Sequence, residues 1–111
     1  MGTDRELFPG ALEMMILRSL ERKPMHGYAL VQYIKSVSDD LLRVEEGSLY
    51  PALQRMLRER WVTAEWGVSS TKRRIRVYTL TPSGAERLQA EVRRFDRMIE
   101  GIQRVLAPSQ S

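Results

Sequence analysis

The sequence predicts a mainly α (α+β) fold, and three observations lead to it. Apolar residues recur at helical spacing in three short segments, then come two stretches rich in β-branched and aromatic residues, and a long amphipathic segment closes the chain. The net positive charge lies in the residues between the two β-like stretches and in the second stretch itself. This order is that of a winged helix-turn-helix, here with a long C-terminal dimerisation helix.

The charge distribution is more informative than the total. The chain has 111 residues, enough for one small domain, and a net charge of +4. Residues 67–80 carry four basic residues and no acid, so the other 14 basic and 14 acidic residues cancel. These four cations are Lys72, Arg73, Arg74 and Arg76. An anionic partner is therefore expected at this segment.

Cysteine is absent, so neither a disulfide framework nor a thiolate metal site is expected. No apolar run approaches the roughly 18 residues of a membrane span, and residues 1–6 are too polar for a signal peptide. We expect a cytoplasmic protein with no membrane association.

The first helix is expected to follow Gly10 and to end near Arg22, where residues 23–24 stop it with a proline. A second helix begins around His26-Gly27 and ends before a polar turn. Leu42–Val44 is expected to form a short strand.

The third helix is expected to take Ser48 as its N-cap, which places Pro51 at the third helical position, where no intrahelical bond is lost. Its apolar residues face inward. Four residues point outward on a helix with no acid between Glu46 and Glu59, namely Tyr50, Gln54, Arg55 and Arg58.

Residues 61–66 and 75–80 are expected to pair as a hairpin with its tip at 67–74, a loop long enough to be mobile. Thr81-Pro82 then opens the last helix, with threonine as cap and proline at the first position. An apolar seam with alternating steps of four and three runs along it, through Leu88, Val92, Phe95, Ile99, Ile102 and Leu106.

A helix of about 25 residues spans roughly 37 Å, farther than so small a domain can cover, so its seam needs a second chain. The plain alternative is a surface helix that packs on its own domain. We expect a two-fold dimer, joined also by the first helix, with two reading helices about one DNA turn apart. The expected organisation is a DNA-binding domain at 1–81, a dimerisation helix at 82–107 and a disordered tail at 108–111.

Three strings in this order carry a family resemblance: residues 26–28 (HGY), residues 47–53 (GSLYPAL), and residues 78–81 (YTLT) with Gly84 after them. The chain resembles the PadR family of transcriptional regulators, in its compact branch with a single C-terminal dimerisation helix. The resemblance implies that the helix from Ser48 enters the major groove, that the hairpin reaches along the backbone, and that the protein represses transcription.

Side-chain chemistry suggests the roles at the duplex. The hydroxyls of Ser48 and Tyr50 can donate to phosphate, while Gln54 suits adenine and Arg55 suits guanine. Packing is the alternative for Tyr50, and mere solvation of the helix is the alternative for Arg55 and Arg58. For the four hairpin cations the alternative to phosphate binding is a solubilising surface, although four like charges repel one another without an anionic partner.

In compact PadR relatives the position of Phe95 often carries an aromatic residue at the dimer centre, where planar hydrophobic effectors stack. We therefore expect a planar hydrophobic small molecule there, with walls supplied by Met14, Met15, Met98 and Ile99. Ordinary interface packing is the alternative for Phe95.

Catalysis is not expected, because the chain lacks a phosphate-binding loop, a nucleophile elbow and a paired acidic constellation. Its one histidine, His26, cannot complete a zinc site and is expected to make a local hydrogen bond at a helix start, so no metal or other cofactor is expected. The leading hypothesis is a homodimeric repressor of a palindromic operator. A protein-interaction module without sequence-specific DNA binding and a non-specific architectural protein stay open.

Overall fold

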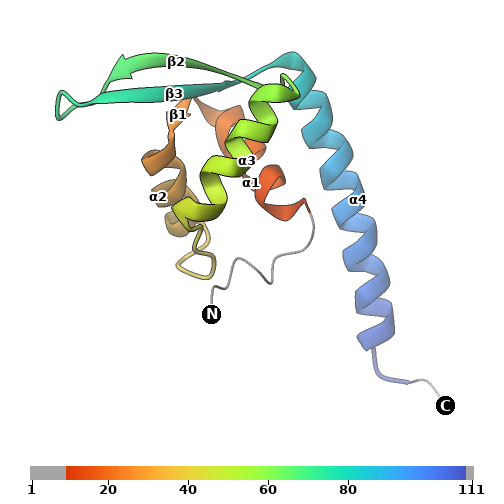
Figure 1. The fold of residues 1–111 in the computed structure, drawn as a ribbon. Helices are drawn as coiled ribbons and strands as arrows, with labels where there is room; N and C mark the ends of the chain where they lie inside the picture. The colour runs from red at the N-terminus through yellow and green to blue at the C-terminus, as the bar shows by residue number, and fades with distance from the viewer. Residues whose placement is uncertain (1–9, 110–111) are drawn as a thin grey trace.

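The computed structural model describes residues 10–109, in which the chain forms four helices and three strands. These are α1 (Ala11–Arg22), β1 (Met25–His26), α2 (Gly27–Val37), α3 (Glu46–Arg58), β2 (Val62–Val68), β3 (Arg74–Leu80) and α4 (Pro82–Leu106). Figure 1 shows α1, α2 and α3 gathered on one side of the sheet. Helix α4 starts after β3, and its C-terminal half extends beyond the three short helices. The predicted mainly α winged-helix fold is confirmed.

The sheet is antiparallel, with strand order β1-β3-β2. Its edge strand β1 pairs Met25 with Tyr78. The strand predicted at Leu42–Val44 is wrong, because this segment is irregular in the structure. Its Val44 is buried in the core, at 5% exposed. The two residues of β1 are too few to show an alternating pattern, so the sequence did not reveal the third strand.

The hairpin of β2 and β3 forms the wing, and it is longer than predicted. Its strands extend to Val68 and back to Arg74, so the expected tip at 67–74 shrinks to 69–73. The tip is closed by backbone bonds from Ser69 N to Arg73 O (2.8 Å) and from Lys72 N to Ser69 O (2.9 Å). Lys72 lies in the left-handed region, at φ 64°. The wing cations are therefore mounted on an extended, hydrogen-bonded ribbon.

Helix α3 begins three residues earlier than predicted. Its N-cap is Glu45, and the amide of Leu49 donates to the Glu45 carbonyl at 2.9 Å, so the expected capping by Ser48 is wrong. Ser48 instead occupies the third helical position, and Pro51 the sixth. The Gly47 carbonyl consequently has no amide partner from Pro51. Both Gly47 and Pro51 are exposed, so water can serve that carbonyl.

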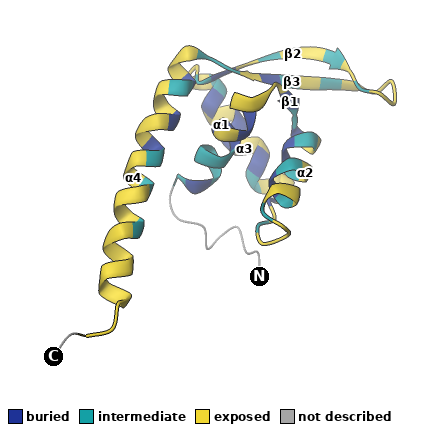
Figure 2. Cartoon of the chain, turned by 180° about the vertical axis from the view of Figure 1, so that it is seen from behind, coloured by how far each residue is buried: buried dark blue, intermediate teal, exposed yellow. Residues whose placement is uncertain are grey.

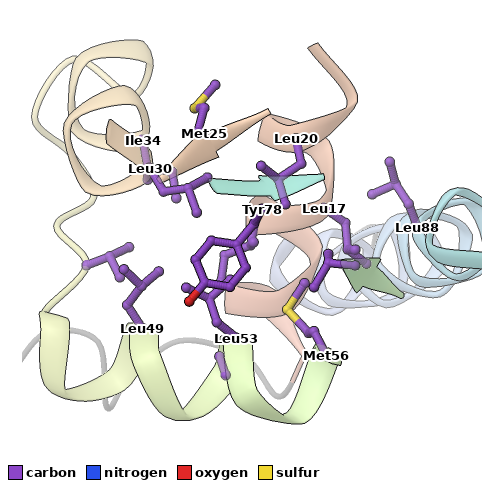
Figure 3. Packing of buried hydrophobic residues seen from close by; sticks show 14 residues of the cluster. Leu17, Leu20, Met25, Leu30, Ile34, Leu49, Leu53, Met56, Tyr78 and Leu88 are labelled. Carbon is purple, nitrogen blue, oxygen red and sulfur yellow. The ribbon is translucent and has the colours of Figure 1, made fainter. Parts of the chain in front are cut away.

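The core lies where the three short helices meet the sheet. Figure 3 shows Leu49, Leu53 and Met56 pointing from α3 toward Tyr78 on β3. The three α3 residues are fully buried and Tyr78 is 3% exposed. The inward face predicted for α3 is thus correct, and its burial fixes which side of the helix faces solvent. At roughly 1.5–3 kcal/mol per buried side chain, this face anchors α3 in the domain.

The N-terminus of α4 is fastened to the connection between α3 and β2. The hydroxyl of Thr81 accepts from Gly84 N at 2.9 Å, as the predicted cap requires, and also donates to the Arg60 carbonyl at 2.7 Å. The amide of Thr81 donates to the carbonyl of Trp61 at 3.1 Å. Gly84 packs so tightly that a Cβ on it would overlap the Trp61 carbonyl oxygen. We call these four residues the junction.

A buried carboxylate, that of Glu91, forms ion pairs within the next turns of α4. Glu91 is 8% exposed and pairs with Arg87 at 2.8 Å and with Arg94 at 3.2 Å. The guanidinium of Arg87 also stacks over the ring of Trp61, 4.7 Å from its centroid. The two ion pairs lie within α4, whereas the stacking of Arg87 on Trp61 joins this part of the helix to the connection between α3 and β2.

Burial declines along α4, as Figure 2 shows by its change from blue to yellow. Leu88 is 1% exposed and belongs to the core of its own chain, which corrects its predicted place in a dimer seam. Val92, Phe95 and Ile99 are partly buried, whereas Ile102 is 37% and Leu106 is 75% exposed. The helix ends at Leu106, and the tail predicted at 108–111 lies partly outside the described residues.

No helix within residues 10–109 is long and apolar enough to cross a membrane. In the same residues no group of three or more His, Cys, Asp and Glu side chains is placed to hold a metal ion.

Candidate nucleic-acid interface

The exposed face of α3 follows from the burial of its opposite face. Successive residues are about 100° apart around a helix. Because Leu49, Leu53 and Met56 point into the core, Gln54 and Arg58 lie near the centre of the solvent-facing side. Tyr50 and Arg55 fall on its two flanks. Of the predicted base-reading residues, Gln54 is thus central, and Arg58 is better centred than Arg55.

Tyr50 is both a packing residue and a surface residue. Its ring lies over the start of α2, where a Cβ on Gly27 would come within 2.8 Å of the Tyr50 Cζ. Tyr50 as a whole is nevertheless 42% exposed. Burial, and then the nearby charge of Glu46, raises the pKa of the Tyr50 phenol. The phenol therefore keeps its proton at neutral pH and remains a hydrogen-bond donor, as a phosphate contact requires.

The two remaining α3 candidates face other groups. Ser48 is only partly exposed. Arg55 binds Glu13 of α1 through its guanidinium, and its Nε donates to the Glu13 Oε2 at 3.2 Å. Arg55 is thus turned toward α1 and away from the centre of the face, an arrangement that its spacing on α3 alone did not indicate.

The wing carries its cations around a tryptophan that was not among the predicted site residues. Trp66 is 60% exposed, and Arg74 stacks over its ring at 4.3 Å from the centroid, with Arg76 at 5.9 Å. Trp66 pairs with Arg76 across the two strands. The sequence alone did not indicate Trp66, because the register of β2 with β3 was unknown. Only the observed pairing places the indole and both guanidinium groups on one face.

Lys72 and Arg73 lie at the exposed tip of the wing. Within residues 10–109 none of the four wing cations takes part in a salt bridge with a carboxylate. The salt bridges there involve other side chains. The predicted excess of positive charge at the wing is therefore also uncompensated in space.

A cleft of about 880 Å³ separates the wing from the starts of α2 and α3. Its walls bring Tyr50 together with Arg73, Arg74 and Arg76. The other predicted DNA-binding residues, Ser48, Gln54, Arg55, Arg58 and Lys72, do not line it. The cleft therefore joins one flank of α3 to the wing, and one cationic wall could follow a phosphate backbone.

His26 also lines this cleft, and its predicted role is wrong. It stands at the N-cap of α2 but makes no side-chain capping bond. Its ring instead stacks with that of Tyr28, with centroids 6.5 Å apart.

The model of the transcriptional regulator PadR-like family matches residues 16–90, from the middle of α1 to the first turns of α4. This chain belongs to that family. The PadR-like regulator therefore controls transcription and is not an enzyme, and its family implies that it binds DNA.

Two curated relatives are similar to this regulator. The negative transcriptional regulator PadR of Bacillus subtilis (strain 168) is 29% identical over 77 residues. A 37.1 kDa protein in transposon TN4556 of Streptomyces fradiae is 36% identical over 86 residues. These matches cover 69% and 78% of the PadR-like chain. The chain spans 42% and 23% of the relatives' own lengths, less than half of either.

Solved structures are similar over most of the chain. A PadR family transcriptional regulator from Eggerthella lenta DSM 2243 is 30% identical, with a TM-score of 0.76, and the match covers 95% of this chain and 89% of that one. A transcriptional regulator from Clostridium thermocellum is 23% identical, with a TM-score of 0.82, and the match covers 89% and 96%. The second likeness supports the fold alone.

Two grooves between α1 and α4 of the PadR-like regulator hold most of the predicted effector residues. Met14 and Phe95 line both grooves. Met15 lines the larger one, of about 400 Å³, which also reaches α2. Met98 lines the smaller one, of about 290 Å³, and Ile99 lines neither.

Proposed function

We propose that this PadR-like regulator binds a palindromic operator as a homodimer in the cytoplasm and represses transcription by occluding the promoter. The observation that carries the proposal is the set of four wing cations, which form no salt bridge with a carboxylate of residues 10–109 and lie next to the exposed face of α3. Held close together without counter-anions, such cations repel one another, and a phosphate backbone relieves that repulsion.

In this proposal α3 lies in the major groove. Gln54 and Arg58 contact base edges from the centre of the exposed face, and Tyr50 and Ser48 donate to phosphate. Lys72, with its three arginine neighbours, follows the backbone from the wing. If each protomer neutralises ~4 phosphates, a dimer gives a slope of log K against log salt near −7.

The exposed apolar side of α4 supports the homodimer. Beyond Val92 the helix offers Phe95, Ile99, Ile102 and Leu106, whose exposure rises toward the C-terminus. An apolar surface of this kind favours association with a like surface on a second copy. Two-fold symmetry then presents two copies of α3 to two half-sites, about 34 Å apart.

Release by a planar hydrophobic molecule is the second part of the proposal. Phe95 lies between two grooves whose apolar walls include methionines, and methionine adapts to varied shapes. Repression is supported by the name of the Bacillus subtilis relative, a negative transcriptional regulator.

The test is a mobility-shift titration with DNA from upstream of the chain's own gene and with a random duplex of equal length, each at two salt concentrations. The double variant Arg73→Ala, Arg74→Ala should weaken both complexes, because it removes contacts to phosphate and not to bases. Its matched control is Arg93→Ala, Arg97→Ala, which removes the same charge from exposed positions on α4.

Three outcomes separate the hypotheses. Preference of the wild-type chain for the upstream DNA supports the operator-binding regulator. Equal binding of both duplexes favours an architectural role. No binding at either salt concentration favours a protein-interaction module, and equal affinities of the wing variant and its control would remove the wing from the mechanism.

A further inference from the structure

The salt bridge between Arg55 and Glu13 links α3, the proposed reading helix, to α1. Both the Nε and a terminal nitrogen of Arg55 donate to the same carboxylate oxygen of Glu13. Within residues 10–109 this is the only salt bridge that joins two different helices. The side chain of Glu13 is 20% exposed and that of Arg55 is 49% exposed, so the pair lies at the border of the exposed α3 face.

The pairing occupies one of the two edges with which Arg55 could make a bidentate contact to nucleic acid. Arginine reads guanine, or grips a phosphate, with two parallel N–H groups of its planar fork. In Arg55 the edge formed by Nε and one terminal nitrogen already points at a carboxylate. Arg55 therefore cannot present that edge to DNA without leaving Glu13.

Arg58 supplies the comparison within the same helix. It lies one turn further along α3, it is exposed, and no salt bridge holds it within the described residues. Two arginines of one reading helix thus differ in availability, and the difference comes from a residue outside the helix.

We propose that Glu13 is a positioning residue that competes with DNA for Arg55 and thereby limits the affinity of the reading helix. The proposal rests on the proposed placement of α3 in the major groove. While the pair persists, Arg55 adds little to binding, because its positive charge is neutralised by an adjacent negative one. When Glu13 loses its charge, Arg55 becomes one more cation per protomer that faces the duplex.

The position of Glu13 in the chain gives this competition a second consequence. Met14 and Met15 follow Glu13 directly on α1 and line the grooves against α4. Helix α1 thus contacts the reading helix on one side and the grooves on another, so a displacement of α1 by a groove ligand also changes the hold on Arg55.

The experiment measures DNA affinity against salt concentration for Glu13→Gln, Arg55→Ala and the double variant, using the upstream duplex and a random duplex as probes. Glu13→Gln keeps the shape of the side chain and removes its charge. Glu21→Gln is the matched control, because it makes the same charge change on the same helix but frees only Arg18, its partner three residues away. Glu13→Asp, which keeps the charge on a shorter arm, is the second variant if glutamine impairs folding.

We expect Glu13→Gln to steepen the slope of log K against log salt by about 0.9 per protomer, because one more phosphate is neutralised. Between 0.3 M and 0.05 M salt this corresponds to a relative gain of about fivefold per protomer. Arg55→Ala alone should bind within about twofold of wild type, and adding it to Glu13→Gln should restore the wild-type slope. Glu21→Gln should leave the slope unchanged, and Glu13→Asp should fall between wild type and Glu13→Gln.

Two results would overturn the proposal while leaving DNA binding intact. One is a wild-type slope for Glu13→Gln. The other concerns the affinity lost when Arg55 is replaced with alanine. If this loss is as large in the wild-type chain as in the Glu13→Gln variant, Arg55 already binds DNA while Glu13 is charged. If neither the wild-type chain nor Glu13→Gln binds either duplex, the proposed function fails together with this inference.

Discussion

Replacing Gly84 with alanine should destabilise the protein far more than so small a change suggests. A Cβ at this position would overlap the Trp61 carbonyl oxygen and come within 2.9 Å of its carbon and 2.8 Å of the Leu80 Cδ1. The leucine methyl can rotate away, but the carbonyl belongs to the backbone and accepts from the Thr81 amide. Forcing extra volume against fixed structure costs about 1–3 kcal/mol or somewhat more.

Alanine also gains about 1 kcal/mol over glycine inside a helix, which offsets part of that cost. At the upper end of that cost, which a backbone clash favours, a net loss of about 2 kcal/mol remains and should lower Tm by roughly 10 °C in a domain of this size. Thermal unfolding followed by circular dichroism measures it. Gly47→Ala is the matched control, because a Cβ on Gly47 would have no atom within 4 Å beyond its own helix backbone and chain neighbours. Equal Tm values for the two variants would refute the steric reasoning.

Three further predictions concern the wing, the dimer face and base reading. Trp66→Ala should weaken binding to a random duplex several-fold, because exposed cation–π contacts of about 0.5–1 kcal/mol each no longer order Arg74 and Arg76. Trp66→Phe should keep most of that affinity in the same titration, and equal losses in both variants would argue against stacking. Leu106→Asp should leave the protomer folded, since Leu106 is 75% exposed, but should shift sedimentation toward the monomer. An unchanged mass would place the dimer face elsewhere. Gln54→Ala should lower the preference for the operator by about 1–3 kcal/mol while random-duplex affinity stays constant. Parallel losses on both duplexes would mean that Gln54 binds the backbone.

Elements with strong local signals were predictable from the sequence. The end of α1 before Pro24, the inward face of α3 and the Thr81 cap of α4 each depend on residues close together in the chain. The errors arose where pairing partners lie far apart. Strand β1 exists only because Met25 meets Tyr78, and the start of α3 at Glu46 overrides the capping preference of Ser48.

The candidate site divides in the same way. A count of charges was enough to locate the wing cations, because residues 67–80 contain no acid and, within residues 10–109, no carboxylate forms a salt bridge with them. The partners of those cations were not predictable, since Trp66 becomes their stacking surface only through the register of β2 with β3. Arg55 looked available because Glu13, which holds it, lies 42 residues away in the sequence. Leu88 shows the opposite case, because its heptad position suggested a second chain and the structure places it in its own core.

The junction holds the first turn of α4 next to the C-terminal end of α3, so α4 can act as a lever that pivots at this fulcrum. The helix is about 37 Å long, so a rotation of about 5° at its fastened first turn swings the far end by about 3 Å. Phe95 is about 20 Å from the fulcrum, and a wedge that pushes it by 1 Å tilts the helix by about 3°. The small molecule proposed to bind at Phe95 would therefore tilt the helix by roughly twice the angle, per ångström of displacement, of one bound at its far end.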